Sequence, residues 1–341
     1  MDKLVTVIIP AWNAERWLEN TLRSVLGQSY PRLRILVIDD GSTDGTAALL
    51  ERLRREDPRL DYRTVPNGGP ANARNRALEQ LPEGTDYVMF LDADDLLEPD
   101  AVEYALTNAE GAELVIFGFS IQRPDGSLRP YCEKEELLDR EGLAAALPRL
   151  YKANLLNQVW AKLYTADLVR ELRFPDYRWG EDRLFLFEAL EKLQRVKVLP
   201  ESKHRYVMHE GESLITRYYE KKFHVCCEVD RRMEELCRSL GVQEDGDFRY
   251  MFSKSVFSCL TTLYAPNCRL TRAEKRAEAA RIGRDERVQS RCRETSGGLP
   301  TQVLCAVLRS GRPGLILACF RLVAVVGERF PELFMRIKHR K

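Results

Sequence analysis

An apolar run ends in three aspartates where the sequence reads FLDADD, residues 90–95. Asp92, Asp94 and Asp95 would repel one another if they were buried together, because each side chain carries a negative charge. A hard divalent cation such as Mn²⁺ or Mg²⁺ relieves that repulsion, and it typically bridges one or two carboxylates to a diphosphate. The alternative is an exposed turn in which Asp94 or Asp95 only caps the next helix. These six residues alone leave both interpretations open.

A second acidic pair follows another apolar run, in RILVIDDGSTDGT. Asp39 and Asp40 stand at the end of that run. If the two runs are adjacent parallel strands, both acidic ends meet at one edge of the sheet, which is where open α/β sheets bind ligands. The second pair therefore favours a ligand site over two unrelated turns.

The end of the first apolar run carries groups that suit a nucleoside. In IIPAWNAER, Pro10, Trp12, Asn13 and Glu15 follow the run directly. An aromatic ring there can stack on a base, and a carboxylate can accept a hydrogen bond from a base N–H. Ordinary packing is the alternative for Trp12.

A glycine pair and an arginine complete the candidate pocket. In GGPANARN, Gly68 and Gly69 allow a close approach of the backbone, and Arg74 offers a cation for a phosphate. The alternative for Arg74 is a solvated charge on a helix. Together with the acidic strand ends, these residues predict a pocket for a nucleoside diphosphate and a metal ion.

These residues need a scaffold, and the first 120 residues supply one by alternating apolar strands with helical stripes. Strands are expected at 4–9, 34–38, 60–65, 87–91 and 113–120, with helical segments between them. Such alternation predicts right-handed crossovers and a mostly parallel sheet. Beyond a turn at 123–127, residues 139–172 look helical, Val196–Val198 suggests a late strand, and the chain reads as helical from Tyr218 onward.

Composition and missing motifs exclude several classes. With 53 Lys and Arg against 52 Asp and Glu, the net charge of +1 gives no field that would recruit nucleic acid. Nine cysteines without a CxxC pair indicate a reducing, cytoplasmic compartment. The N-terminal apolar run is too short for a signal peptide, and we find no uninterrupted apolar stretch of a membrane span. Neither GxGxxG after the first strand nor GxxxxGK[ST] occurs, which disfavours a Rossmann dehydrogenase and excludes a P-loop enzyme.

At these residues the sequence resembles glycosyltransferase family 2, the inverting enzymes of the GT-A fold. The stretch VTVIIPAWNAERWLENTLRSVLGQSYPRLRILVIDDGSTDGT resembles the family's opening segment, NGGPANARNRAL its N-G-G…A-R-N element, and FLDADD its DxD motif. The resemblance covers residues 4–120 and continues more weakly to about 217. It implies an α/β GT-A domain over 1–217, with a nucleotide-sugar-binding half (1–120) and an acceptor-side half (121–217), followed by a helical C-terminal region (218–341).

The resemblance also implies roles for single residues. Asp94 and Asp92 would hold Mn²⁺ or Mg²⁺, Asp40 would contact the base with support from Asp39, and Arg74 would lie near the diphosphate. The whole set expected to bind the nucleotide sugar is Pro10, Trp12, Asn13, Glu15, Asp39, Asp40, Gly68, Arg74, Asp92, Ala93, Trp160 and Lys162.

The catalytic base is expected later, in YRWGEDRLFLF, which resembles the family's ED element. Asp182 would take the proton of the acceptor hydroxyl, with Glu181 as its neighbour or as a contact to the acceptor. The alternative is a charge pair at a helix N-terminus. Within QVWAKLYTADL, Trp160 and Lys162 would shape a substrate pocket, with packing and a solvated charge as their alternatives.

A late loop, HEGESLITR, resembles one that closes over the diphosphate and offers His209, Ser213 and Arg217. The last residues, PGLILACFRLVAVVGERFPELFMRIKHRK, mix apolar and basic side chains. This composition suits a helix that lies on the anionic inner surface of the membrane. The alternative is a helix that packs on the catalytic domain, or on a second subunit in a homodimer.

The implied function is transfer of a sugar from a nucleoside-diphosphate sugar, most often a UDP-sugar, to a saccharide or lipid-linked acceptor in cell-surface polysaccharide synthesis. Two rivals stay open. FLDADDLL also resembles the DxD strand end of haloacid-dehalogenase-type phosphatases, but those enzymes place it on the first strand. A non-catalytic, membrane-associated module that binds nucleotide sugars is the third hypothesis.

Overall fold

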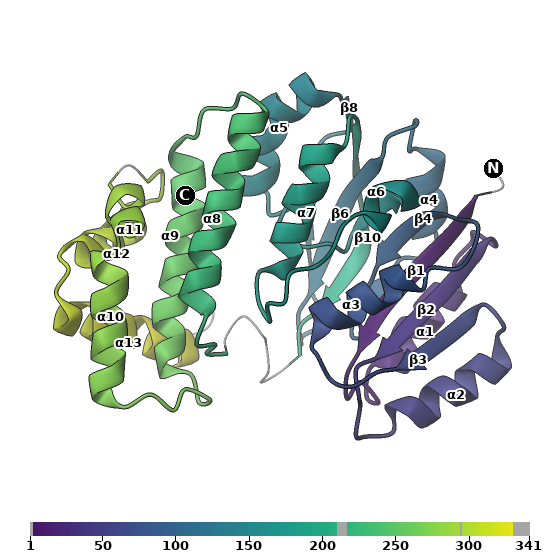
Figure 1. Ribbon diagram of the computed structural model, residues 1–341, viewed down its shortest axis with the longest axis horizontal. Coiled ribbons are helices and arrows are strands. Elements are labelled where there is room, and N and C mark those ends of the chain that lie inside the picture. Colours follow the sequence, from purple (N-terminus) through teal and green to yellow (C-terminus); the bar gives the residue numbers. More distant parts are fainter. Residues whose placement is uncertain (1–2, 210–216, 294, 330–341) are drawn as a thin grey trace. The chain divides into compact units, whose positions relative to one another are not determined.

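The computed structural model describes residues 3–209, 217–293 and 295–329 (Figure 1). The chain divides into two compact units, Met1–Glu210 and Gly211–Lys341. The sequence predicted the boundary between the catalytic domain and the helical region to lie between residues 217 and 218. The first unit contains the sheet and every described residue of the candidate site, and the second unit is helical.

The first unit is built on a ten-stranded sheet with the order β3-β2-β1-β4-β9-β6-β10-β5, in which β7 pairs with β6 and β8 with β10. Strand β1 is apolar on both faces, and Val5, Val7 and Ile8 are fully buried, as a central parallel strand requires. The strands are β1 (Leu4–Ala11), β2 (Leu33–Asp39), β3 (Leu60–Thr64), β4 (Thr85–Phe90), β5 (Leu96–Leu97), β6 (Leu114–Gln122), β7 (Leu128–Tyr131), β8 (Glu136–Leu138), β9 (Lys162–Thr165) and β10 (Val196–Val207).

Helices connect these strands, and their ends follow local sequence signals. Pro70 opens α3 after Gly69, and the Asp139 carboxylate caps α5 by accepting a hydrogen bond from Gly142 N at 2.8 Å. The helices of this unit are α1 (Leu18–Leu26), α2 (Thr46–Glu56), α3 (Pro70–Glu79), α4 (Ala101–Thr107), α5 (Arg140–Lys152), α6 (Ala166–Arg170) and α7 (Glu181–Lys192).

The register of three neighbouring strands positions the site. Strand β1 runs parallel to both β2 and β4, pairing Ala11 with Asp39 and Ile8 with Phe90. The carboxyl ends of β1, β2 and β4 therefore meet at one edge of the sheet. Asp39 ends β2 and Asp40 follows it, while Asp92–Asp95 follow β4 on the other side of β1. The convergence expected from the sequence is confirmed by this topology.

The expectation that residues 139–172 are helical is wrong in part. Strand β9 lies within this range and inserts antiparallel between β4 and β6. Its residues Leu163 and Tyr164 are fully buried. A four-residue strand that is buried on both faces has no periodicity to separate it from a helix, which explains the error.

Strand β10 is much longer than the predicted Val196–Val198. Polar residues interrupt its apolar pattern, but ion pairs satisfy them: Lys203 Nζ lies 2.7 Å from Asp100 Oδ2, and Arg205 Nη2 lies 2.7 Å from Glu98 Oε1. Helix α1 begins only at Leu18, because residues 14–17 form turns after Asn13, which has a positive φ of 48°.

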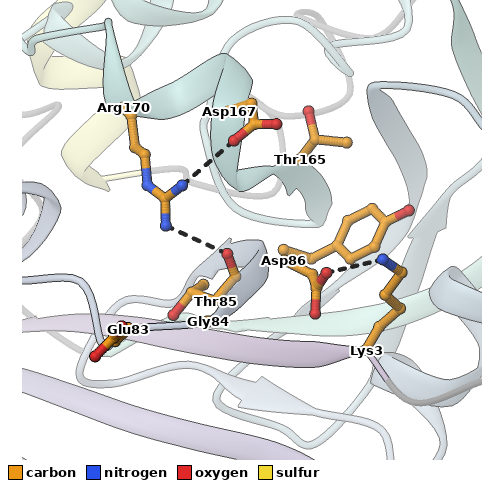
Figure 2. A pocket seen from close by; sticks show the side chains of 9 residues that line it. Lys3, Glu83, Gly84, Thr85, Asp86, Thr165, Asp167 and Arg170 are labelled. Atoms are coloured by element: carbon orange, nitrogen blue, oxygen red, sulfur yellow. Dashed lines mark hydrogen bonds and ion pairs between the residues drawn. The ribbon is translucent and has the colours of Figure 1, made fainter.

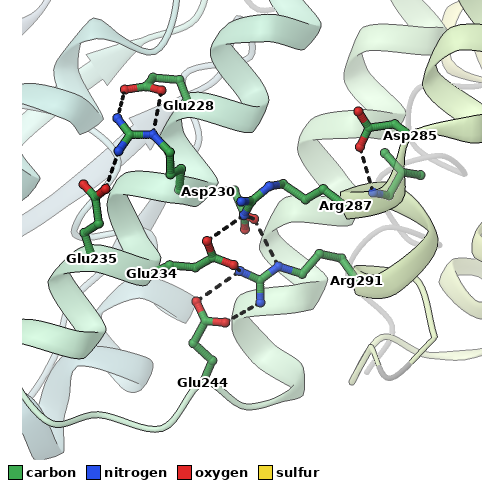
Figure 3. Close-up of polar contacts among 10 residues, drawn as sticks. Glu228, Asp230, Glu234, Glu235, Glu244, Asp285, Arg287 and Arg291 are labelled. Carbon is green, nitrogen blue, oxygen red and sulfur yellow. Dashed lines mark hydrogen bonds and ion pairs between the residues drawn. The ribbon is translucent and has the colours of Figure 1, made fainter.

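The second unit consists of α8 (Lys222–Ser239), α9 (Gly246–Thr261), a 3₁₀ turn η2 (Thr262–Tyr264), α10 (Arg272–Arg284), α11 (Glu286–Arg291), α12 (Leu299–Arg309) and α13 (Pro313–Arg329). Arg291 ties α11 to α8 and to the segment before α9 (Figure 3). Its side chain bonds Asp230 Oδ2 at 3.0 Å and Glu234 Oε1 at 2.7 Å, and it also bonds Glu244. No helix in the described ranges is both long and apolar enough to span a bilayer.

Candidate active site

A buried arginine links the acidic strand end of β4 to the start of α7. Arg74, on α3, donates from Nη2 to Asp92 Oδ1 at 2.7 Å and from Nη1 to Asp182 Oδ1 at 2.8 Å and Glu181 Oε1 at 3.3 Å. The Arg74 side chain is only 3% exposed, and its guanidinium lies 5.4 Å from the centre of the Phe174 ring. Three carboxylates from two separate segments of the chain therefore converge on one cation.

Burial and neighbouring charges shift the pKa values of the acids in this cluster to different extents. Burial raises the pKa of Glu181 to about 7, helped by the neighbouring Asp182 and opposed by Arg74. Burial also raises the pKa of Asp182, but Arg74 opposes this directly through the shorter contact. Burial alone would lower the pKa of Arg74, whereas its three carboxylates raise it. The guanidinium thus stays charged and favours the ionised form of Asp182, the acid expected to be the base.

The acidic end of β2 organises the backbone of the glycine pair. Asp40 Oδ1 accepts from Gly68 N at 2.8 Å, and Oδ2 accepts from Gly69 N at 2.7 Å. Burial raises the pKa of Asp40, and the two N–H groups oppose the rise. Asp39 is also buried and accepts from Ser42 N and Thr64 Oγ1. Both carboxylates therefore fix loops at this edge of the sheet.

The loops after β1 and β2 are joined to each other. Asn13 Oδ1 accepts from Thr43 N at 2.8 Å, and Glu15 Oε2 accepts from Gly45 N at 2.7 Å. A Cβ on Gly45 would lie 2.7 Å from Glu15 Cδ, so a larger residue there would require the Glu15 carboxylate to shift. Trp12 is 56% exposed beside these loops, which leaves its ring available for stacking.

The three aspartates after β4 lie in different environments. Asp95 is fully buried, where its Oδ2 lies 2.9 Å from His204 Nε2 and its Oδ1 accepts from Val207 N at 3.0 Å. Ala93 O accepts from Thr21 Oγ1 at 2.9 Å, which holds the turn against α1. Asp94 is 43% exposed. Asp95 therefore anchors the turn to β10, and Asp94 projects from it.

A histidine that the sequence singled out lies against Asp94. His209 Nε2 is 3.4 Å from Asp94 Oδ2, and it is a buried atom without a hydrogen-bond partner. The His209 ring stacks on Trp17 at 3.9 Å, and Arg16 covers the Trp17 ring at 4.3 Å. Burial raises the pKa of Asp94 to about 7, helped by Asp95 and Asp92, and burial lowers the pKa of His209. No three described His, Cys, Asp or Glu side chains gather closely enough to hold a metal ion by themselves.

Trp160 and Lys162 are buried rather than open to a ligand. Trp160 is 8% exposed, and its ring stacks on His204 at 4.3 Å. Lys162 is 1% exposed and donates to Trp160 O at 3.2 Å. Burial lowers the pKa of Lys162 to about 7, with Asp182 opposing the shift. A direct contact with a nucleotide sugar stays a prediction for both residues, and their burial favours a supporting role.

A pocket of about 570 Å³ lies at the opposite end of the parallel strands, beside their amino-terminal ends (Figure 2). It surrounds the beginnings of β1 and β4, where Lys3 Nζ lies 2.8 Å from Asp86 Oδ1 and Arg170 pairs with Asp167. Ligands of open α/β sheets bind beyond the carboxyl ends of strands, so this pocket is not the site.

The structure brings the predicted residues together in two groups. One joins Arg74, Asp92, Glu181 and Asp182, and the other joins Asp40 to Gly68. Sequence reasoning did not find the Asp95–His204 pair, because neither residue has a local signal for its partner 109 positions away. Ser213 lies outside the described residues, and Arg217 is exposed in the second unit.

Comparison with known proteins gives these groups a context. The chain is 28% identical over 250 residues to the glycosyltransferase GlyA of Streptococcus pneumoniae, a match that covers 71% of this chain but only 36% of GlyA. It superposes on the crystal structure of S. aureus TarS 1-349 in complex with UDP-GlcNAc with a TM-score of 0.66, covering 96% of this chain and 91% of TarS 1-349 at 18% identity. The mannosyltransferase PcManGT from Pyrobaculum calidifontis, in complex with GDP-Man and Mn²⁺, gives a TM-score of 0.50 at 17% identity, covering 97% of this chain and 88% of that one.

The structural likeness confirms the GT-A fold with its helical C-terminal region. The sequence model of Glycosyl transferase family 2 matches residues 6–193, which contain the acidic ends of β2 and β4, the glycine pair, Arg74 and the start of α7. That span exceeds half of the chain, and this protein is therefore a member of glycosyl transferase family 2.

Proposed function

We propose that this protein is an inverting glycosyltransferase that moves a sugar from a nucleoside-diphosphate sugar, a UDP-sugar in the first instance, to a saccharide or lipid-linked saccharide acceptor. One observation carries the proposal. The Arg74 guanidinium joins Asp92, at the acidic end of β4, to Asp182, at the start of α7. A donor-side acid and a candidate base thereby share one edge of the sheet.

In this proposal Asp182 is the general base. Its carboxylate accepts the proton of the acceptor hydroxyl as that oxygen attacks the anomeric carbon. The bond from the anomeric carbon to the diphosphate oxygen breaks on the opposite face, so the nucleoside diphosphate leaves and the configuration inverts. Arg74 orients Asp182 and favours its ionised form before the acceptor arrives.

The loops after β1 and β2 would bind the nucleoside. The exposed ring of Trp12 offers a stacking surface for the base. Asp40 would contact the base while holding the backbone at Gly68 and Gly69, with Asp39, Asn13 and Glu15 fixing the surrounding loops. Pro10 and Ala93 would contribute backbone surface beside them.

A divalent cation, Mn²⁺ or Mg²⁺, fits beside Asp94. The buried and unpartnered His209 Nε2 faces the Asp94 carboxylate, and these two groups would supply one nitrogen and one oxygen ligand, with Asp92 as a further acid after the same strand. Such cations need only one or two protein carboxylates when a diphosphate completes the coordination. When bound, the cation would stabilise the negative charge that develops on the leaving diphosphate. PcManGT, of the same fold, holds Mn²⁺ with its GDP-sugar.

The two rival functions are weaker. A haloacid-dehalogenase-type phosphatase carries its DxD motif on the first strand, whereas here the motif follows β4 and lies within the family 2 match. A non-catalytic nucleotide-sugar-binding module would not need a buried arginine that holds a carboxylate at the start of α7. Turnover distinguishes the module from the enzyme.

The decisive experiment measures release of nucleoside diphosphate from UDP-, GDP- and dTDP-sugars, with Mn²⁺, with Mg²⁺ and after chelation, with saccharide acceptors. We expect metal-dependent turnover of one donor class and a loss of about 10²–10⁴-fold in kcat for Asp182→Asn, with donor binding retained. Asp167→Asn is the matched control, because that carboxylate is 95% exposed on α6. Normal turnover by Asp182→Asn would refute the assignment of the base.

A second experiment tests the cation site. We expect Asp94→Asn and His209→Gln to abolish the extra thermal stabilisation that Mn²⁺ gives to the UDP-bound protein. The control is His224→Gln, an exposed histidine on α8. If both site variants keep the full Mn²⁺ effect, the cation does not bind beside Asp94.

A further inference from the structure

Two helices of the second unit expose apolar side chains at helical spacing. On α13, Leu315, Leu322 and Val325 are 47%, 64% and 37% exposed, and Ala318 is exposed between them. On α12, Leu299 and Val303 are 72% and 51% exposed, and Ala306 continues the row. We call these seven side chains the apolar face. Single exposed leucines are ordinary, but two rows at i, i+3, i+4 and i+7 spacing on consecutive helices are not.

The apolar face does not arise from a loosely attached chain end. Helix α13 packs through its other side, where Ile316 and Phe320 are fully buried and the Phe320 ring lies 5.7 Å from the ring of Phe257 on α9. Tyr264 Oη donates to Leu317 O at 2.7 Å. The helix is therefore held by one face and presents the opposite face to solvent.

The charged residues of α12, of α13 and of the turn between them are all arginines, apart from Glu328 near the end of α13. Arg309, Arg312 and Arg321 are exposed on or beside α12 and α13, and residues 295–327 contain no Asp or Glu. The sequence continues with Glu328 and Arg329, and then, outside the described residues, with Glu332, Arg336, Lys338, Arg340 and Lys341. An apolar face bordered by arginines that form no ion pair with an acid among the described residues matches the interface of a membrane that carries anionic headgroups.

These charges argue against a second copy of the chain as the partner. In a symmetric dimer each apolar face would meet itself, so the arginines of one copy would oppose those of the other, and Glu328 near the end of α13 is the single acidic residue of these two helices. Like charges placed together at an interface are unfavourable. Lipid phosphates supply the anions that the face lacks.

We propose that the apolar face of α12 and α13 docks on the surface of an anionic lipid bilayer, with Leu299, Leu315 and Leu322 entering the headgroup region and the arginines contacting lipid phosphates. The protein would lie on the membrane without crossing it. This proposal does not depend on the transferase reaction, so a failed turnover assay would leave it standing.

The test uses the full chain and vesicles of phosphatidylcholine, alone or mixed with phosphatidylglycerol. We expect cosedimentation with the mixed vesicles, at least about tenfold weaker binding to phosphatidylcholine, and weakening by salt. The double variant Leu315→Ser, Leu322→Ser and the triple variant Arg309→Gln, Arg312→Gln, Arg321→Gln should each reduce binding to mixed vesicles by about tenfold or more.

Two controls keep the result interpretable. Leu128→Ser removes an exposed leucine of the first unit, which is 51% exposed on β7, and should leave vesicle binding unchanged. Thermal melting should show that the α12 and α13 variants fold, since each replaced side chain is exposed. The proposal is overturned if the chain ignores anionic vesicles, if binding survives the leucine substitutions, or if the same substitutions instead abolish a dimer detected by light scattering.

Discussion

Arg74 is the residue on which the candidate site depends most, because it holds three carboxylates from two chain segments on a single planar cation. A guanidinium can bond several acids at once in fixed directions, whereas a lysine ammonium is a point charge on a flexible stem. The resemblance to the family implied that Arg74 lies near the diphosphate. Its contacts with Asp92, Glu181 and Asp182 favour a positioning role instead.

Arg74→Lys separates these two roles. If Arg74 positions the base, the variant should lose about 10²-fold in kcat while KM for the donor stays within a few fold, because the lysine cannot hold Asp182 and Asp92 together. Steady-state kinetics with varied donor provide the measurement, and Arg76→Lys, at an exposed position of the same helix, is the control. A raised donor KM with unchanged kcat would instead assign Arg74 to the phosphate.

Glu181 makes a prediction about stability and pH. Its pKa is about 7 in the folded protein against an ordinary value of 4.5, so the folded state binds more protons than the unfolded state between these values. Stability from this group is present below pH 4.5 and is lost as pH rises through 7. Glu181→Gln removes that loss. The unfolding free energy of the variant minus that of the unsubstituted protein should therefore be larger at pH 8 than at pH 5, by roughly 2–3 kcal/mol.

Denaturant unfolding of both proteins at the two pH values measures this difference. Glu188→Gln, on the same helix but 37% exposed, should show no comparable change with pH. A Glu181→Gln difference that is the same at pH 5 and pH 8 would mean that Glu181 titrates near its ordinary pKa.

At the scale of elements, the sequence predicted the strands and helices that carry strong local patterns. Strand β1 is a run of buried β-branched residues, and α3 begins with Pro70 directly after a glycine pair. Both elements could therefore be predicted from the sequence alone. Parallel pairing then followed from their alternation, which brought Asp39 and Asp92 to one edge. The acidic strand ends were predictable because they depend on this local order.

The parts that the sequence did not predict depend on distant partners. Strand β9 is held by antiparallel pairing with β4 on one side and β6 on the other. No property of Lys162–Thr165 alone specifies these partners. Likewise, nothing near Arg74 indicates that its partner acids lie 107 and 108 residues away. Long-range contacts of this kind need the fold before they can be identified.

Strand β9 carries a buried lysine, and this placement is testable. The pKa of Lys162 falls to about 7 from an ordinary 10.5, so the unfolded chain binds the extra proton between these values and stability rises with pH across that window. Lys162→Met removes the buried charge. The variant should be more stable than the unsubstituted protein by about 1–4 kcal/mol at pH 7, and the gain should shrink as pH approaches 10.5.

Unfolding measurements at pH 7 and pH 10 test this prediction, with Lys192→Met, 40% exposed on α7, as the control. A destabilised Lys162→Met protein with an unchanged pH dependence would show that Lys162 is stabilised by contacts that outweigh its burial. A raised donor KM in a stable variant would favour the substrate contact that the family resemblance implies.

At the scale of the whole molecule, the chain combines two units with separate cores. The first is centred on the sheet, with fully buried side chains such as Ile8 and Phe185, and the second on helices α8 to α13, with Val256 and Phe320 at its centre. The family match covers most of the first unit and none of the second. We therefore propose that the first unit recognises the donor and that the second docks on a membrane.

Arg291 tests whether these assignments are separable. It bonds Asp230, Glu234 and Glu244, and its side chain is only 7% exposed (Figure 3). Arg291→Met would remove a positive charge that neutralises these carboxylates. We therefore expect the free energy of unfolding of the second unit to fall by about 3–5 kcal/mol. Thermal melting should show an earlier transition, while the stabilisation of the first unit by UDP and Mn²⁺ stays unchanged. Arg293→Met, at an exposed position beside it, should cost about 0.5 kcal/mol or less. A single shared transition that shifts as a whole, with a weaker UDP effect, would show that the two units unfold as one and that donor binding depends on both.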